Sequence, residues 1–534
     1  MTEMLWQTPE QRAALLKRIV GHPSVTLSQG ERDFPYFLQG ELKQLAYFES
    51  HPEHIVLTPT GDGRHAVLAY YTHEHATDTI VLISHHDTVG IEDFGVYQDM
   101  AFDMDRITAI FEQDHTYLDA ESIKDMKEGI YSFGRGSMDM KPGLMLHMSL
   151  IEKAIAEQWK VNLVLVSVPD EEVNSLGMRR AMAALADLKV KHNWHIALHL
   201  NSEPTFQQAT DDNDHYVYTG SIGKIMPSAL CFGRETHVGN ALSGVSSNLM
   251  LSYINQEMEY QVSFKETYRN EHTPLPVSLL SKDIKDYYDV QTPFRSVGLF
   301  NVFLFERNAD DAFKQFNYHV IKAIERFETK MNQLMVDENE TMHIKVNVLT
   351  FEQLLTYAKQ QYDEAKVETV ISQAIAQHEE TYQQSIAVVD ALMGMCKKLA
   401  PAVVTFFAPP YYPAVNASDD PLIEALVETA AEVSQTAFQR TSNRLHYFNG
   451  ISDLSYAQYR GGIKDSVTYE QNTPVYHRTY DIPFDAIEHI SAPVFNCGPI
   501  GKDAHKVNER INMVSACEEL PVVLETLIKR HFLN

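Results

Sequence analysis

Residues 79–87, TIVLISHHD, decide the fold, because a short apolar run ends there in two histidines and an aspartate. An apolar run of this length, without helical periodicity, predicts a buried strand. Similar runs stand at residues 161–168 (VNLVLVSV) and 194–200 (WHIALHL), with helical segments between them. Strands that alternate with helices predict an α/β domain with three layers and a mainly parallel sheet. In such a sheet, ligands bind at the carboxyl ends of the strands.

The amino-terminal segment predicts a helix rather than a targeting signal. Thr8 is an N-cap, Pro9 stands at the first helical position, and Gln11 completes a capping box. The first twenty residues contain no apolar core of a signal peptide, and no run of 18 apolar residues follows. We therefore expect a cytoplasmic protein without a membrane span.

The middle of the chain has a different pattern of apolar residues, and this pattern predicts an inserted domain. Apolar residues recur every three or four positions from Phe313 to Met331, which predicts an amphipathic helix. Alternation over 343–348 predicts a half-buried strand, and a long helical stretch follows to about residue 398. We expect a catalytic α/β domain in two parts, flanking an α+β lid or dimerisation domain. The expected boundaries are 1–212, 213–400 and 401–534.

Composition narrows the class of partner. The 534 residues carry 44 Lys and Arg against 72 Asp and Glu, a net charge of −28. Such a surface repels phosphate backbones and anionic lipids, so neither nucleic acid nor membrane is an expected partner. The four cysteines form no CxxC pair, which argues against a zinc ribbon or a thioredoxin-type motif. A small molecule or short peptide is the expected ligand.

Five segments rich in acids or histidine follow the predicted strands or lie in glycine-rich turns. They are SHHD at 84–87, GRGSMDMK at 134–141, PDEE at 169–172, NSEP at 201–204 and GPIGKDAH at 498–505. A parallel sheet brings such segments to one edge. Two histidines and three carboxylates suit zinc, manganese or cobalt better than calcium or magnesium. One carboxylate could bridge two ions, and Asp139 is the candidate because glycines allow tight turns around it.

Each segment by itself has an ordinary alternative. A His-x-Asp sequence or a pair of glutamates is usually a surface or capping feature. Asp139 could be the N-cap of the next helix, and His505 is one of 24 histidines. Five such segments in order, each at the expected edge of the sheet, favour a metal site.

As a set, SHHDTV, GRGSMDMKPG, PDEEVNSLG, NSEP and GPIGKDAH resemble the motifs of the co-catalytic di-zinc metallopeptidases. That family includes carboxypeptidase G, aminoacylase, peptidase T and succinyl-diaminopimelate desuccinylase. The string VVTFFAPPYYP and the long helical middle look like its RocB branch, the arginine-utilisation proteins. The resemblance implies a zinc-peptidase-like fold and a hydrolase of peptide or N-acyl amino-acid amide bonds, acting in arginine or amino-acid catabolism.

The resemblance also implies roles at the centre. Five ligands would hold two zinc ions, or manganese or cobalt in their place: His85 and Glu203 on one, Glu172 and His505 on the other, and Asp139 on both. Glu171 would be the general base on the water. Asp87 would hydrogen-bond the second nitrogen of His85 and set its tautomer.

For substrate contacts the resemblance implies residues of the inserted domain and one loop. His237 in FGRETHVG would stabilise the oxyanion, often from a partner subunit, which implies a homodimer. Asn248 lies where the family has Gly-x-Asn-Ala, although Ser246 replaces the usual asparagine. Asp453 in GISD corresponds to a loop lining the cleft. Arg295 and Arg307 are alternatives for an arginine that binds the substrate carboxylate.

A second hypothesis comes from another class of protein. The chain could be a catalytically silent metal-binding protein that senses or binds an amino acid. Glu171 favours the enzyme, because metal ligation does not require that second glutamate.

Overall fold

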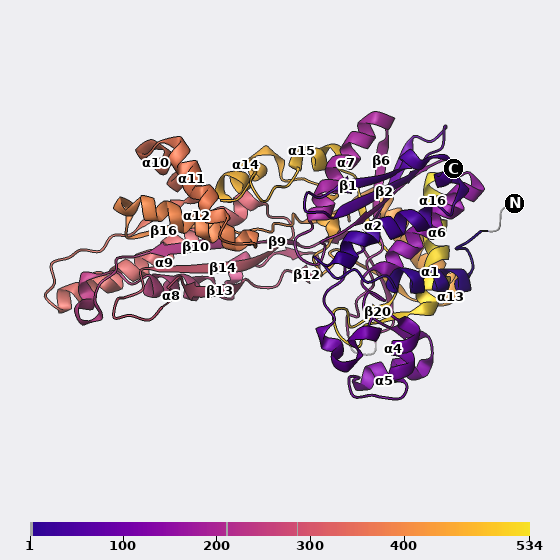
Figure 1. The fold of residues 1–534 in the computed structure, drawn as a ribbon, viewed down its shortest axis with the longest axis horizontal. Helices are drawn as coiled ribbons and strands as arrows, with labels where there is room; N and C mark the ends of the chain where they lie inside the picture. Colours follow the sequence, from indigo (N-terminus) through magenta and orange to yellow (C-terminus); the bar gives the residue numbers. More distant parts are fainter. Residues whose placement is uncertain (1–3, 210–211, 286, 534) are drawn as a thin grey trace. The chain divides into compact units, whose positions relative to one another are not determined.

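The computed structural model describes residues 4–209, 212–285 and 287–533 (Figure 1). Two compact units divide the chain. Unit 1 contains Met1–Ser221, Val415–Tyr459 and Pro483–Asn534, and unit 2 contains Ile222–Ala414 and Arg460–Ile482. Unit 2 therefore interrupts unit 1 at two places in the sequence.

The unit boundaries lie elsewhere than the predicted positions 212/213 and 400/401. Strand β7 (His215–Tyr218) pairs within the large sheet of unit 1, so the chain changes unit only after Ser221. Strand β16 (Ala402–Phe407) pairs within unit 2, so the return follows Ala414. The second segment of unit 2 carries α14 (Gly462–Asn472), which packs on α9 (Ala309–Asp337).

Unit 1 is built on a mixed sheet of eight strands in the order β1-β2-β5-β3-β6-β19-β7-β18. Besides β7, the strands are β1 (Ile55–Pro59), β2 (His65–Tyr71), β3 (Asp78–His85), β5 (Asn162–Val168), β6 (His195–Asn201), β18 (Ser442–Leu445) and β19 (Val494–Asn496). The four central strands, β5, β3, β6 and β19, run parallel. The predicted α/β class is confirmed.

Two crossovers place helices on both faces of this sheet. The chain passes from β3 through α6 (Lys141–Glu157) to β5, and then through α7 (Leu176–His192) to β6. These connections run in opposite directions along the strand order, and right-handed crossovers then put the helices on opposite faces. Helices α1 (Pro9–Val20) and α16 (Leu520–Phe532) pack on α6, while α15 (Phe484–Ile490) packs on α7.

A small three-stranded sheet in unit 1 joins two distant loops. It contains β4 (Tyr131–Phe133), β20 (Gly501–Lys502) and β21 (Arg510–Asn512), in the order β20-β21-β4. The turn that carries Asp139 follows β4, and the loop that carries His505 connects β20 to β21. The sheet therefore fixes these two loops in one place.

Unit 2 has its own sheet, ordered β13-β14-β10-β16-β15, with β9 (Gly223–Ile225) also paired to β14. The remaining strands are β10 (Pro227–Phe232), β13 (Val277–Asp283), β14 (Arg295–Leu304) and β15 (Asn347–Thr350). Helices α8 (Ser247–Met258) and α9 pack together and contact the sheet, as does α12 (Thr381–Met395).

Local signals in the sequence are largely confirmed. The capping box of Thr8 and Gln11 is present, and the apolar stripe from Phe313 to Met331 is buried on α9. The long helical stretch is three helices: α10 (Phe351–Gln361), α11 (Glu364–Ile375) and α12. The strand predicted over 343–348 is wrong at its start, because the Val346 amide bonds the Glu328 carboxylate instead of a strand.

Within residues 4–209, 212–285 and 287–533, no helix combines the length and apolar character that crossing a membrane requires.

A substitution at Leu165 tests how tightly the central sheet of unit 1 is packed. Leu165 is fully buried on β5, between Ala69 of β2 and Leu82 of β3. We expect Leu165→Ala to lower the free energy of unfolding by about 2–5 kcal/mol, because a cavity remains. Urea unfolding measures this. The matched change at Leu279, which is 54% exposed, should cost much less, and equal losses would contradict the buried position.

Candidate metal centre

The carboxyl ends of three parallel strands bring the predicted residues of unit 1 together. His85 is the last residue of β3, Glu171 and Glu172 follow β5, and Glu203 follows β6. Because β5, β3 and β6 are neighbours in the sheet, residues far apart in sequence meet at one edge.

The first group of side chains forms around His85. Its Nε2 lies 3.0 Å from Asp139 Oδ1 and 3.6 Å from Glu203 Oε1. Its Nδ1 donates a hydrogen bond of 3.0 Å to the main-chain oxygen of Asp87. A carbonyl oxygen only accepts, so this bond sets the orientation of the ring and leaves Nε2 toward the carboxylates. Burial lowers the pKa of His85, but the bond to Asp139 and the nearby carboxylates outweigh it and hold the pKa well above its ordinary value.

The second group forms around His505. Its Nε2 lies 3.1 Å from Asp139 Oδ2 and 3.1 Å from Glu172 Oε2. Hydrogen bonds to Asp139 and Glu172 raise the pKa of His505 to about 10. Asp139 thus presents one carboxylate oxygen to each histidine.

All five predicted ligands are therefore brought together, in two groups that share Asp139. In each group the candidate ligand atoms lie within 4.8 Å of one another. One group contains His85, Asp139 and Glu203, and the other contains Asp139, Glu172 and His505.

The donor set fits divalent cations of the zinc class. Imidazole and carboxylate are ligands for zinc, manganese and cobalt. Burial, with repulsion among neighbouring carboxylates, raises the pKa values of Glu172 and Glu203. Cations between these groups would offset that repulsion, so the residues fit a metal centre on chemical grounds.

Glu171 belongs to neither ligand group but lies beside them. Its Oε2 is 4.0 Å from His85 Nε2, and 10% of its side chain is exposed. Burial, together with the charges of Asp453 and Glu203, raises the pKa of Glu171 well above its ordinary value. Asp453 is itself 2% exposed, and burial raises its pKa to about 7.

The Asp87 carboxylate supports the centre mainly by accepting hydrogen bonds from the main-chain amides of the two glutamates. It accepts hydrogen bonds from the amides of Glu171 (3.1 Å) and Glu172 (3.3 Å), and from the Thr26 hydroxyl (2.9 Å). Its distance to His85 Nδ1 is longer, 3.6 Å. Asp87 thus holds the two glutamates in place, a contact that the His-x-Asp pattern does not reveal.

Glu509 fixes the main chain of the turn that carries Asp139, and the sequence alone did not identify it. Its Oε1 accepts from the amides of Met138 (3.1 Å) and Asp139 (3.4 Å), and its Oε2 pairs with Arg135 at 2.7 Å. Arg135 also binds Asp93 at 2.8 Å. The available signal was Arg135 inside GRGSMDMK, since a buried arginine needs an acidic partner.

A second buried ion pair supports the loop of the two glutamates. The Nη1 atom of Arg64 lies 2.7 Å from Asp170 Oδ1 and 3.1 Å from Glu31 Oε1. Its Nη2 atom lies 2.6 Å from Asp62 Oδ2. The Asp170 amide donates to Glu31 Oε1 at 2.9 Å, and Asp170 itself has a φ of 73°. Arg64 stands in the turn between β1 and β2, so nothing local in the sequence connects it with residue 170.

The remaining predicted residues lie in unit 2. His237 is exposed at the start of a 3-10 turn, and its Nδ1 accepts from the Gly239 amide at 3.1 Å. Asn248 is exposed on α8 and donates to Asp283 at 3.4 Å. Arg307 donates to the main-chain oxygens of Phe264 and Ser263, whereas Arg295 pairs with Asp390.

Comparison with known proteins gives the class and then the family. The model of "Peptidase family M20/M25/M40" matches residues 81–478. Uncharacterized protein YqjN of Bacillus subtilis (strain 168) is 37% identical over 535 residues, which cover 98% of this chain and 97% of the relative. Protein RocB of the same organism is 26% identical over 543 residues, covering 98% and 95%.

A solved structure supports the fold. The M20 family metallo-carboxypeptidase Sso-CP2 from Sulfolobus solfataricus matches with a TM-score of 0.55 at 12% identity, over 97% of this chain and 98% of that one. The fold and the family together define a metallopeptidase-like hydrolase. The chain belongs to peptidase family M20/M25/M40. The resemblance read from the motifs is confirmed, and RocB is a relative.

A substitution at Asp62 tests whether the ion pairs of Arg64 stabilise the fold around the loop of the two glutamates. Burial raises the pKa of Asp62, but hydrogen bonds from Arg64 and Thr60 outweigh it and lower the pKa from 3.8 to about 2. Such a carboxylate stabilises the fold above pH 3.8 and loses its contribution as the pH falls through about 2.

We expect Asp62→Asn to lower the free energy of unfolding at pH 7 by about 1 kcal/mol, because the side chain is 37% exposed and solvent screens the pair. The difference from wild type should shrink as the pH falls below 3.8. Urea unfolding at several pH values measures it. Asp105, 70% exposed in its pair with Lys17, is the control, and an Asp62→Asn deficit that grows in acid would contradict the sign.

Proposed function

We propose that this protein is a hydrolase with two metal ions that cleaves the amide bond of a short peptide or an N-acyl amino acid. The observation that carries the proposal is the pair of ligand groups that share Asp139, with a further carboxylate, Glu171, beside them. Membership of the peptidase family supports the reaction class.

The proposed ligands divide between the two ions. His85 and Glu203 would hold one ion, Glu172 and His505 the other, and Asp139 would contribute one oxygen to each. Zinc is the metal we propose, with manganese or cobalt as substitutes. The chemistry such ions supply when bound is Lewis acidity toward a carbonyl oxygen and toward water.

Glu171 is the proposed general base. It would take a proton from the attacking water at its carboxylate and later deliver that proton to the leaving amine. The Glu171 amide donates a hydrogen bond to the Asp87 carboxylate, which fixes the main chain from which the Glu171 side chain extends. We propose that Asp453, buried and electrostatically coupled to Glu171, contributes to the substrate side of the same centre.

Unit 2 is the proposed lid, with a homodimer as the proposed assembly. The Nδ1 of His237 accepts a hydrogen bond from the Gly239 amide, so the proton of its neutral ring stands on Nε2. That N–H is exposed and suited to an oxyanion, in the same chain or in a second copy. We propose Asn248, which is also exposed, as a substrate contact.

The RocB relative supports one choice of substrate. RocB is similar over 98% of this chain, so arginine-containing dipeptides and N-acyl arginine belong in the first panel of amides. An aliphatic panel of the same bond types is the comparison, because the chemistry of the centre does not itself select a side chain.

Metal content tests the ligand assignment. We expect about two zinc ions per chain after reconstitution, measured by elemental analysis. Asp139→Ala should lose both ions, because it serves both groups, whereas His505→Ala should lose one. His75→Ala, at an exposed position in unit 1, should keep both. Full metal content in Asp139→Ala would contradict a shared ligand.

Glu171→Gln tests catalysis separately from metal binding. We expect kcat for amide hydrolysis to fall about 10²–10⁴-fold, the range for loss of a general base, with the metal content unchanged. Stopped assays on the panel of dipeptides and N-acyl amino acids measure it. If the metal-loaded wild type binds these compounds but cleaves none, the protein is a binding protein or sensor, and the hydrolase proposal fails.

A further inference from the structure

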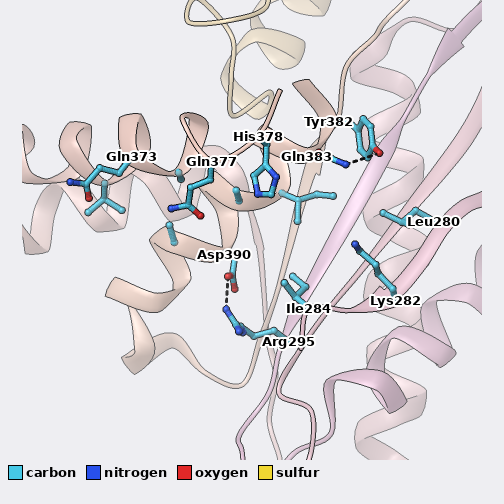
Figure 2. Close-up of a pocket in the computed structure, with 15 residues that line it drawn as sticks. Leu280, Lys282, Ile284, Arg295, Gln373, Gln377, His378, Tyr382, Gln383 and Asp390 are labelled. Atoms are coloured by element: carbon cyan, nitrogen blue, oxygen red, sulfur yellow. Dashed lines mark hydrogen bonds and ion pairs between the residues drawn. The ribbon is translucent and has the colours of Figure 1, made fainter. Parts of the chain in front are cut away.

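Unit 2 contains a cavity formed by its own residues alone, between the edge of its sheet and helices α11 and α12. Its volume is about 540 Å³, within the range of small-molecule sites. Figure 2 shows Lys282 and Arg295 on the strand side and Gln377, His378 and Asp390 on the helical side. The five proposed metal ligands and Glu171 all belong to unit 1.

Arg295 is only partly engaged in this cavity. One of its N–H groups donates to Asp390 Oδ2 at 2.7 Å, and 33% of the side chain is exposed. Its guanidinium also stacks near the Phe294 ring, at 5.0 Å. Among the residues that the structure describes, no other acceptor pairs with the remaining donors. A planar guanidinium with free donors is suited to bind a carboxylate through two hydrogen bonds.

Lys282 adds a second positive charge to the same cavity. It lies on β13, one strand away from Arg295, and its side chain extends toward the helical side in Figure 2. In the described parts of the chain its ammonium group has no ion pair or hydrogen bond. Two cations with one acid, Asp390, give the lining a net positive charge, in a chain whose net charge is −28. The cavity therefore attracts an anion.

The rest of the lining is apolar with a few amides. Leu280, Ile284 and Ile386 belong to, or pack against, the hydrophobic core of unit 2, and Ala387 lines the cavity beside them. Gln373 and Gln377 supply hydrogen-bonding groups along one wall. An inorganic anion would leave the apolar part of the lining in contact with water, whereas an organic body would cover it.

We propose that this cavity binds a small organic anion, a carboxylate on a short branched apolar body. Arg295 and Lys282 bind the carboxylate, and Leu280, Ile284 and Ile386 contact the body. Asp390 orients Arg295 through their ion pair. This site is separate from the metal centre in its residues, and the proposal does not depend on the hydrolase function.

Calorimetric titration of the whole protein with 4-methylpentanoate tests the site, because this acid has no amide bond to cleave. The comparison compounds are 4-methylpentan-1-ol, which lacks the charge, and inorganic phosphate, which lacks the body. We expect the acid to bind at least about tenfold more tightly than either, since a charge-assisted hydrogen bond is worth that factor. Equal affinity for the alcohol, or for phosphate, would overturn the proposal.

Variants locate the binding. Lys282→Gln changes an exposed strand residue, and we expect the Kd of 4-methylpentanoate to rise about tenfold. Arg295→Lys keeps the charge beside Asp390 but loses the paired donors, and should weaken binding at least as much. Ala387→Phe, which fills the cavity, should abolish binding. Lys265→Gln, at an exposed position of unit 2, is the matched control and should bind as the wild type does.

A chelator separates this site from the metal centre. Binding of 4-methylpentanoate should persist after metal removal and in Glu171→Gln, because neither touches the cavity of unit 2. Binding that disappears with the metal, or that is the same in Lys282→Gln and Lys265→Gln, would overturn the proposal. Failure here leaves the amide-hydrolase proposal intact, since that is judged by metal content and turnover.

Discussion

The position of Asp139 is the constraint on which the candidate centre depends. One of its oxygens lies 3.0 Å from His85 and the other 3.1 Å from His505, residues separated by most of the chain. The carboxylate reaches both because its own main chain is fixed: Glu509 accepts the amides of Met138 and Asp139. The small sheet of β4, β20 and β21 then brings the His505 loop beside the same turn. A shift of this turn would separate the two ligand groups.

Several carboxylates share this small buried region. The fold stabilises them with hydrogen bonds from main-chain amides and with ion pairs to arginine side chains. The Asp87 carboxylate accepts hydrogen bonds from the main-chain amides of Glu171 and Glu172. The Glu509 carboxylate accepts hydrogen bonds from the main-chain amides of Met138 and Asp139. Two buried arginines pair with acids near these loops: Arg64 with Asp170, and Arg135 with Glu509. These contacts fix the loops that carry the candidate ligands, and the carboxylates of those residues remain close to one another. Such an arrangement is costly by itself, and divalent cations would stabilise it.

The candidate functional features of the protein lie in both units. Unit 1 carries the strand ends, the ligand groups and Glu171, and its parallel sheet explains why they meet. Unit 2 carries a largely antiparallel sheet, exposed polar residues such as His237, and a cavity with two cations in an acidic protein. Family membership covers both units, because the matching region runs from residue 81 to residue 478.

The sequence by itself determined the strand–helix alternation of unit 1, the amphipathic α9 and the identity of the ligand candidates. These signals are local: an apolar run buries a strand, and an acid or histidine directly after it must lie at the sheet edge. Only the tertiary structure decided which ion pairs and hydrogen bonds hold the loops of the candidate ligands. Arg64 and Asp170 are 106 positions apart, and Glu509 and Arg135 are 374 apart, so no local pattern connects them. It also decided the unit boundaries, because strand pairing of β7 and β16, not composition, determines to which unit a segment belongs. Pairing between distant segments depends on the whole packed chain, and a reading of neighbouring residues does not contain it.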